Sequence, residues 1–295
     1  FIDEKLDNPI GKLLAIGGAV NNGDNELGNS EGIIPVLFEI CILARMIKEL
    51  VEDNSRIEII TTASEIPEET GNCYLEAFTK LGQHNAGVIH IKNRDDAANE
   101  DFHNRVKKAK GILFTGGNQL RLTTILGGTD ILKTILRKYH EEPFMVAGTS
   151  AGAMAMSNIM INGSSSVALL KNEVNLSHGL GFINDVIFDS HFVRRGRFSR
   201  LFQAVATNPE CLGIGLGEDT ALLITEGGKM EAVGTGLVII VDGENIKYTN
   251  ITSAADKEPI SIENLVVHIL VKGNGYDLTT RKFISAYSGN LNVST

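Results

Sequence analysis

The sequence predicts an α/β fold, a mostly parallel sheet with helices on both faces, followed by a β-rich C-terminal part. Two observations predict it. Over roughly the first two hundred residues, short apolar runs alternate with amphipathic helical patterns. After about residue 210 the pattern changes to strands alone. With 295 residues, 43% of them apolar and 21% charged, we expect one folded domain, with a core over 11–241 and an extension over 242–287.

The elements follow in order. We expect strands over 12–16, 56–62, 87–92, 111–115 and 145–149, and later over 213–225, 230–241 and 265–272. Helical spacing of apolar residues indicates helices over 34–51, around 74–81, over 100–110, and over 118–140 with an interruption at Gly127-Gly128. Small residues from Ala151 onward favour a further helix. The glycine- and asparagine-rich stretch 17–32 is typical of a loop, and the polar tail after Tyr287 is expected to fray.

Charge and composition exclude several classes of protein. A net charge of −9 argues against a nucleic-acid partner, and no apolar run reaches the ~18 residues of a membrane span. No metal-ligand spacing and no dinucleotide fingerprint occurs, so we expect neither a metal nor a cofactor. Three scattered cysteines suggest a reduced, cytoplasmic protein. Because the chain starts at Phe1, a removed targeting segment stays an open alternative.

The segment Gly148-Thr149-Ser150-Ala151-Gly152 fits the pattern G-x-S-x-G, between an expected strand and an expected helix. A nucleophile on such a sharp turn needs small neighbours, so that the backbone can fold tightly and a carbonyl can approach. The start of a helix also supplies amide donors, and the N–H of Ala151 could hold an oxyanion. The segment predicts a nucleophilic Ser150; the alternative is an unreactive glycine–serine loop.

A serine nucleophile needs a base, and the base needs an orienting acid. Of seven histidines, His191 alone directly follows an apolar strand-like run, although a structural histidine would read the same way. Glu218 lies in a small-residue turn between strand-like runs and is the candidate acid, with Asp219 and Asp189 as competitors.

Four arginines lie in the seven residues 194–200, shortly after His191: Arg194, Arg195, Arg197 and Arg200. Guanidinium groups bind carboxylates through two parallel hydrogen bonds, so this cluster indicates a substrate with carboxylates. A solvated charged face is the alternative. The turn Gly116-Gly117-Asn118-Gln119 ends another strand and could supply a second oxyanion donor and polar substrate contacts.

Together, four segments resemble the cyanophycinase family, exopeptidases related to aspartyl dipeptidase (peptidase E). They are Gly116-Gly117-Asn118-Gln119, Gly148 to Ala153, Asp189-x-His191-Phe192 with the arginines after it, and Gly213 to Ala221. The resemblance extends from about Gly11 to about Val241. It implies a fold like class I glutamine amidotransferases (flavodoxin-like), with serine in place of their cysteine, and a homodimer.

The resemblance also implies roles for individual residues. Ser150 would be the nucleophile, His191 the base and Glu218 the acid, with the amides of Gly117 and Ala151 as oxyanion hole. Substrate contacts would come from Gln119, Asp189, Arg195, Arg197 and Arg200, and from Ser190, where the family usually has Gln. The implied reaction is serine-type hydrolysis of cyanophycin, a polyaspartate with arginine on each β-carboxyl, to β-aspartyl-arginine dipeptides.

Three other functions are compatible with the sequence. One is a dipeptidase acting on short Asp-X peptides. Another is an esterase of the α/β-hydrolase kind, whose chain order of Ser, acid, His would make Asp219 the acid and His268 the base. The third is a non-catalytic protein that holds acidic peptides with its arginine cluster.

Overall fold

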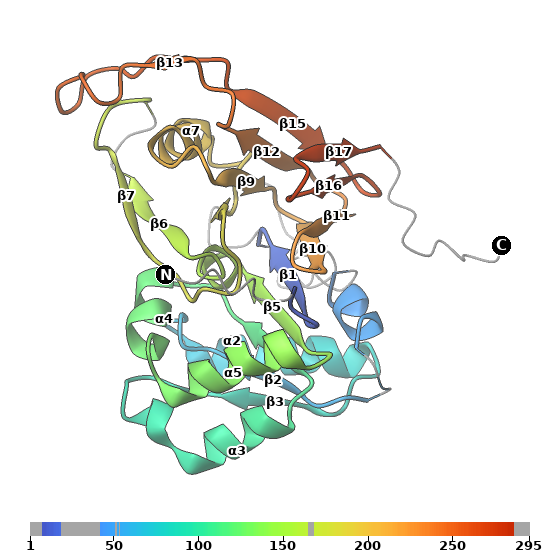
Figure 1. The fold of residues 1–295 in the computed structure, drawn as a ribbon. Helices are drawn as coiled ribbons and strands as arrows, with labels where there is room; N and C mark the ends of the chain where they lie inside the picture. The colour runs from blue at the N-terminus through green and yellow to red at the C-terminus, as the bar shows by residue number, and fades with distance from the viewer. Residues whose placement is uncertain (1–7, 19–41, 51, 53, 165–167, 286–295) are drawn as a thin grey trace, which may run out of the picture.

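The computed structural model describes residues 8–18, 42–50, 52, 54–164 and 168–285 (Figure 1). The stretch 19–32, the first part of the expected helix 34–51, Cys41 and the tail after Tyr287 lie outside the described residues. Most of the described strands belong to two sheets. Figure 1 shows β9, β12 and β15 toward one end of the molecule and β2 and β3 toward the other, with β1 and β5 between.

The larger sheet has nine strands in the order β17-β16-β11-β10-β1-β5-β4-β2-β3. Its parallel half contains β1 (Lys12–Ile16), β5 (Met145–Thr149), β4 (Gly111–Phe114), β2 (Ile57–Ile60) and β3 (Ala86–Ile89). Its antiparallel half contains β10 (Thr220–Thr225), β11 (Lys229–Gly234), β16 (Gly275–Asp277) and β17 (Lys282–Ile284). The predicted α/β class is confirmed.

Helices cover both faces of the parallel half, as predicted, and this burial explains why the residues of β1 from Leu13 to Ile16 are all apolar. Leu14 and Ile16 point to one face and pack with the helical residues 42–48 and with α2 (Pro67–Lys80). Leu13 and Ala15 point to the other face, which α3 (Glu100–Lys108), α4 (Gln119–Leu126), α5 (Asp130–Glu141) and α6 (Ala151–Met154) cover. A strand buried on both faces loses its polar alternation.

The predicted interruption of the helix over 118–140 is confirmed. Helix α4 ends at Leu126, and Gly128 adopts φ +74°, a conformation that favours glycine. Thr129 then caps α5, because its side chain accepts a hydrogen bond from the Leu132 amide. The two helices stay separate because this turn redirects the chain between them.

The smaller sheet has the order β15-β12-β9-β8. Its strands differ from two of those expected from the sequence. It contains β8 (Val186–Asp189), β9 (Leu212–Leu216), β12 (Val238–Asp242) and β15 (Val266–Leu270), and α7 (Phe198–Thr207) packs on it. The single strands expected over 213–225 and 230–241 are wrong. Each divides into one strand of either sheet, because the chain turns at Asp219, which has φ 52°, and at Gly234, which has φ 97°. The first of these turns carries Glu218.

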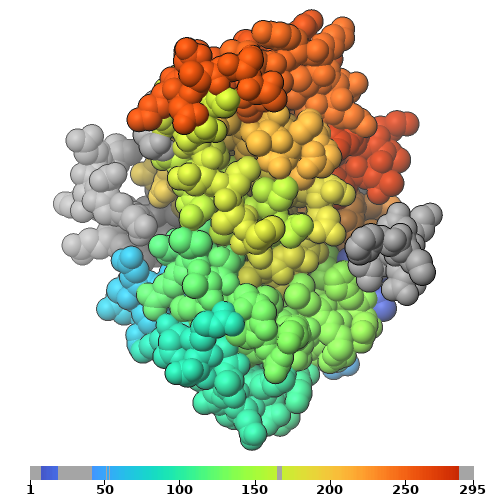
Figure 2. Space-filling model, turned by 60° about the vertical axis from the view of Figure 1, so that its left-hand side comes forward, coloured from blue at the N-terminus to red at the C-terminus, as the bar shows by residue number. Residues whose placement is uncertain are grey.

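The remaining elements were not expected from the sequence. Strands β6 (Ile159–Ser164) and β7 (Val174–His178) pair antiparallel, as do β13 (Tyr248–Thr249) and β14 (Ile262–Glu263), and η1 (Asp96–Ala98) is a single 3₁₀ turn. Figure 2 shows the orange C-terminal residues at one end and the green and cyan residues of α3 to α5 at the other. No helix in the described ranges has the length and apolar character to span a bilayer.

Candidate active site

Ser150 lies on a sharp turn between strand β5 and helix α6. Its backbone has φ 51° and ψ −109°, and its amide donates to the carbonyl of Ile16, at 2.9 Å. A Cβ on Gly148 would lie 2.5 Å from the carbonyl carbon of Gly152, and a Cβ on Gly152 would lie 2.4 Å from the carbonyl oxygen of Phe114. The two glycines of the motif are therefore a steric requirement of the turn that presents Ser150.

Three residues far apart in the sequence meet at this turn. The Oγ of Ser150 lies 3.0 Å from Nε2 of His191, and Nδ1 of His191 lies 3.1 Å from Oε1 of Glu218. Ser150 follows β5, His191 follows β8, and Glu218 lies in the turn between β9 and β10. This chain of contacts has the geometry that nucleophilic catalysis by serine requires.

The pair Gly17-Gly18 at the end of β1 joins these segments. The amide of His191 donates to the Gly17 carbonyl, and the Gly17 amide donates to the Thr220 carbonyl, both at 2.9 Å. Gly18 has φ 103°, and a Cβ there would lie 2.5 Å from Cε1 of His191. The sequence indicated only a tight turn here. In the structure, the turn is the surface against which the imidazole packs.

Burial keeps His191 in the form that a base needs. Its side chain is 12% exposed. Burial lowers its pKa, the hydrogen bond with Glu218 raises it, and the positive charges of Arg195 and Arg197 lower it further. The net result is a pKa below the ordinary value of 6.5, so the imidazole is neutral at pH 7 and can accept a proton.

Glu218 also has a cationic neighbour, Arg194. Nη1 of Arg194 lies 3.5 Å from the same Oε1 that contacts His191, and the arginine side chain is 46% exposed. The sequence placed Arg194 in the cationic cluster without a role of its own. Its position on Glu218 depends on the fold of two loops, so no local signal could have predicted it.

The turn at Gly116-Gly117 lies beside the nucleophile. A Cβ on Gly116 would be 3.5 Å from Cβ of Ser150. Gly117 has φ 134°, and a Cβ there would be 2.0 Å from the carbonyl oxygen of Ala63. Among the described residues, the structure gives no hydrogen bond from the amide of Gly117 or of Ala151. Both amides are thus available as donors.

Two of the arginines expected to hold substrate pair with Asp189, whose side chain is fully buried. Arg200 donates from Nε and Nη2 to the Asp189 carboxylate, and Nη1 of Arg197 lies 3.1 Å from it. Arg197 also donates to the Ser190 carbonyl at 2.7 Å, and burial lowers its pKa to about 10. This buried cluster braces the backbone next to His191, which has φ 50°.

The other expected substrate contacts differ in exposure. Ser190 is 1% exposed, and its hydroxyl donates to the sulfur of Met154. Gln119 is half-buried and donates to the carbonyls of Ile161 and Asn162 on β6. Arg195 is exposed. Of the set that the resemblance implies, Arg195 is therefore the side chain most open to a ligand.

The side chains of the acid and the base in the esterase alternative, Asp219 and His268, have other partners. The ring of His268 packs against Tyr276, with centroids 5.3 Å apart, and against Phe283. Asp219 accepts a hydrogen bond from the hydroxyl of Thr235. Within the described ranges, no three His, Cys, Asp or Glu side chains gather as metal ligands would.

Comparison with known proteins places this chain among peptidases by similarity. The family model described as peptidase family S51 matches residues 40–232. Cyanophycinase from Synechococcus elongatus is 36% identical over 227 residues, which cover 77% of this chain and 70% of the relative. Cyanophycinase from Geminocystis herdmanii (strain PCC 6308) is 37% identical over 227 residues, covering 77% and 84%.

Among solved structures, a peptidase from an acI-B1 Actinobacterium superposes with a TM-score of 0.67 at 23% identity. The match covers 92% of this chain and 98% of that one. At this identity the likeness concerns the fold, and it extends over nearly the whole of both chains.

Proposed function

The chain belongs to peptidase family S51, and from that premise we propose that it is a serine exopeptidase that hydrolyses cyanophycin to β-aspartyl-arginine dipeptides. The observation that carries the proposal is the continuous contact from Ser150 through His191 to Glu218. The substrate is inferred from the names of the relatives. The exposed guanidinium groups of Arg194 and Arg195 agree with a polymer that bears carboxylates.

In the proposed mechanism, Nε2 of His191 takes the proton of Ser150 as the hydroxyl oxygen attacks the scissile carbonyl. Glu218 orients the imidazole and stabilises its protonated form. The amides of Gly117 and Ala151 donate to the oxyanion. His191 then passes the proton to the leaving amine. A water molecule, deprotonated by the same imidazole, attacks the acyl carbonyl, and His191 returns this proton to Oγ of Ser150 as the ester bond breaks.

Substrate recognition divides the arginines into two groups. We assign to Arg195 the role of binding the carboxylates of the substrate. Arg195 is exposed, and it is close enough to His191 for its positive charge to lower the pKa of the imidazole. Arg197 and Arg200 pair with Asp189, so a direct contact of these three with substrate, as the resemblance implies, stays a prediction. The same holds for Gln119 and Ser190, and for the homodimer and the cytoplasmic location.

An assay of the purified protein tests the function. Incubated with insoluble cyanophycin, the protein should clear the suspension and release β-aspartyl-arginine, which mass spectrometry identifies. The same preparation is offered short Asp-X dipeptides. Cleavage of the dipeptides without release of β-aspartyl-arginine would favour the dipeptidase alternative and remove cyanophycin as the substrate.

The pKa of His191 predicts a pH dependence. Activity requires the neutral imidazole, and a lowered pKa keeps it neutral to lower pH. The acidic limb of kcat/KM should therefore lie below pH 6.5, the ordinary histidine value. In Arg195→Ala, one of the charges that lower this pKa is gone, and the limb should move to higher pH.

Arg137→Ala is the matched control, since Arg137 lies on α5 and pairs with Glu141. It should leave the limb in place. The quantity compared is the apparent pKa of the acidic limb of kcat/KM, and not the maximal value of kcat/KM. Weaker substrate binding by Arg195→Ala therefore does not obscure the result. A limb that moves to lower pH in Arg195→Ala would contradict the assignment of the base.

A further inference from the structure

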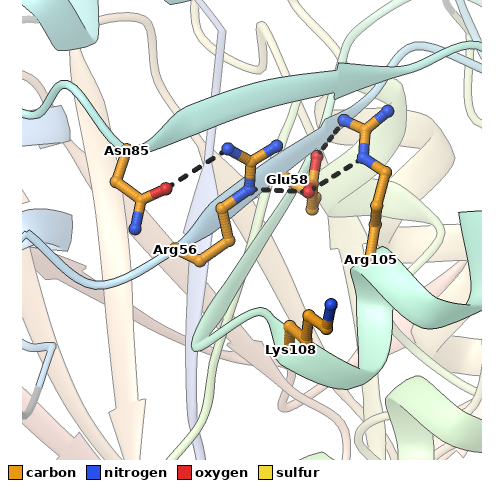
Figure 3. Close-up of a pocket in the computed structure, with 5 residues that line it drawn as sticks. All are labelled: Arg56, Glu58, Asn85, Arg105 and Lys108. Atoms are coloured by element: carbon orange, nitrogen blue, oxygen red, sulfur yellow. Dashed lines mark hydrogen bonds and ion pairs between the residues drawn. The ribbon is translucent and has the colours of Figure 1, made fainter.

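A second polar site lies at the amino ends of the parallel strands, whereas Ser150 lies at a carboxyl end. It is an open cavity of about 450 Å³ lined by Arg56, Glu58, Asn85, Arg105 and Lys108 (Figure 3). Arg56 immediately precedes β2 and Glu58 is its second residue, Asn85 immediately precedes β3, and the other two come from the end of α3. None of these residues belongs to the active site.

A buried carboxylate holds the two guanidinium groups of the cavity in place. The side chain of Glu58 is fully buried. Arg56 donates from Nε to Oε1 of Glu58 at 2.8 Å, and Arg105 donates from Nη2 to Oε2 at 2.5 Å and from Nε to Oε1 at 3.1 Å. In Figure 3 the guanidiniums flank Glu58 on either side. Their positions are thus established before any ligand arrives.

The absence of a side chain on Gly87 leaves space for both guanidinium groups of the cavity. They lie over Gly87 of β3, where a Cβ would be 2.1 Å from Nη2 of Arg56 and 2.8 Å from Nη2 of Arg105. Arg105 also donates to the carbonyl of Val88, and Arg56 donates to the side-chain oxygen of Asn85. Any residue larger than glycine at position 87 would displace at least one of the two arginines.

The cavity carries excess positive charge and unused donors. Three cationic side chains face one carboxylate, a local balance of 3 − 1 = +2 in a chain of net charge −9. Within the described part of the chain, the structure gives no partner to Nη2 of Arg56, to Nη1 of Arg105 or to the ammonium of Lys108. Figure 3 shows Lys108 extending toward the guanidiniums.

We propose that this cavity binds a small oxyanion, the phosphate or carboxylate group of a soluble molecule. Guanidinium groups match the geometry of such groups and form short, charge-assisted hydrogen bonds with them. Because Glu58 already orders both arginines, little side-chain freedom is lost on binding. The site is separate from the catalytic residues and does not depend on the proposed function.

Calorimetric titration of the full chain tests the proposal. Inorganic phosphate and, separately, succinate are titrated at an ionic strength held constant with sodium chloride. We expect saturable binding of at least one of them with one site per chain, and the tighter of the two identifies the group. Lys108→Ala should weaken this binding about tenfold, the effect of losing one charge-assisted hydrogen bond.

Lys107→Ala is the matched control, because Lys107 is the adjacent exposed lysine of the same helix and does not line the cavity. It should bind as the unmodified chain does. Arg105→Lys keeps a positive charge beside Glu58 but loses the planar guanidinium that can form two parallel hydrogen bonds, and it should also weaken binding. Circular dichroism checks that this variant folds. Removal of Arg105 altogether is avoided, since it would leave Glu58 buried with one partner fewer.

Three results would overturn the proposal. One is the absence of saturable binding of either anion. Another is equal weakening in Lys107→Ala and Lys108→Ala, which would indicate a diffuse effect of surface charge. The third is loss of binding in Arg195→Ala, which would move the anion to the active site. Unchanged binding in Arg195→Ala supports the cavity.

Discussion

Ser150→Ala should lose about 10⁶ in kcat, the effect of removing the nucleophile from a serine peptidase. The substitution deletes only Oγ, so the turn at Ser150 and the packing of Gly148 against Gly152 are retained. The release of β-aspartyl-arginine measures turnover, and co-sedimentation with insoluble cyanophycin measures binding, which should persist.

Ser253→Ala, a serine on an exposed turn, is the control and should keep full activity. A serine-reactive phosphonate should add its mass to the unmodified chain and not to Ser150→Ala. If Ser150→Ala hydrolysed the polymer as fast as the unmodified chain, Ser150 would not be the nucleophile. Binding of the polymer without turnover and without phosphonate labelling of Ser150 would instead favour the non-catalytic peptide binder.

Glu218→Gln should lower kcat by about 10⁴, the loss found when the acid of a serine triad becomes an amide. The amide keeps the shape of the side chain, but it no longer stabilises the protonated imidazole or enforces its tautomer. Since the Arg194 side chain is 46% exposed, its charge remains hydrated when the carboxylate is gone. The fold should therefore be retained, and kcat and the melting temperature are measured together.

Asp219→Asn is the sharpest comparison, because Asp219 is the neighbouring residue and was the competing acid. It accepts a hydrogen bond from Thr235 and does not contact His191 in the described structure. It should keep most of the activity. The opposite pattern, with Asp219→Asn inactive and Glu218→Gln active, would transfer the role of the acid to Asp219.

Much of the parallel half of the fold could be predicted from local patterns. Strands β1 and β5 begin and end where their apolar runs do, and the break between α4 and α5 falls at the predicted glycine pair. The pattern failed where two strands are joined by a turn of small residues. There the apolar runs on either side of residues 217–219 were read as one strand, although the chain passes from one sheet to the other at this turn.

The candidate site divides in the same way. The sequence pointed to Ser150, His191 and Glu218, and the structure brings them into contact. It did not reveal that Arg200 and Arg197 pair with a buried Asp189, since a run of arginines reads the same whether it faces solvent or a carboxylate. It also assigned no role to Gly18, whose contact with His191 joins segments that are 173 positions apart in the chain.

The sequence alone determined the class of fold and predicted the turn that presents Ser150, while Asp219 and Asp189 stayed competitors of Glu218 for the role of the acid. The class of fold and this turn depend on the steric demands of neighbouring residues and on the period of apolar side chains, both of which are written in short stretches of chain. Only the tertiary structure decided which arginines stay open to a ligand, how the two sheets share the last strands, and that Arg56, Arg105 and Lys108 surround one cavity. Burial and ion pairing depend on residues that come into contact only after folding, and a local sequence pattern does not predict those contacts.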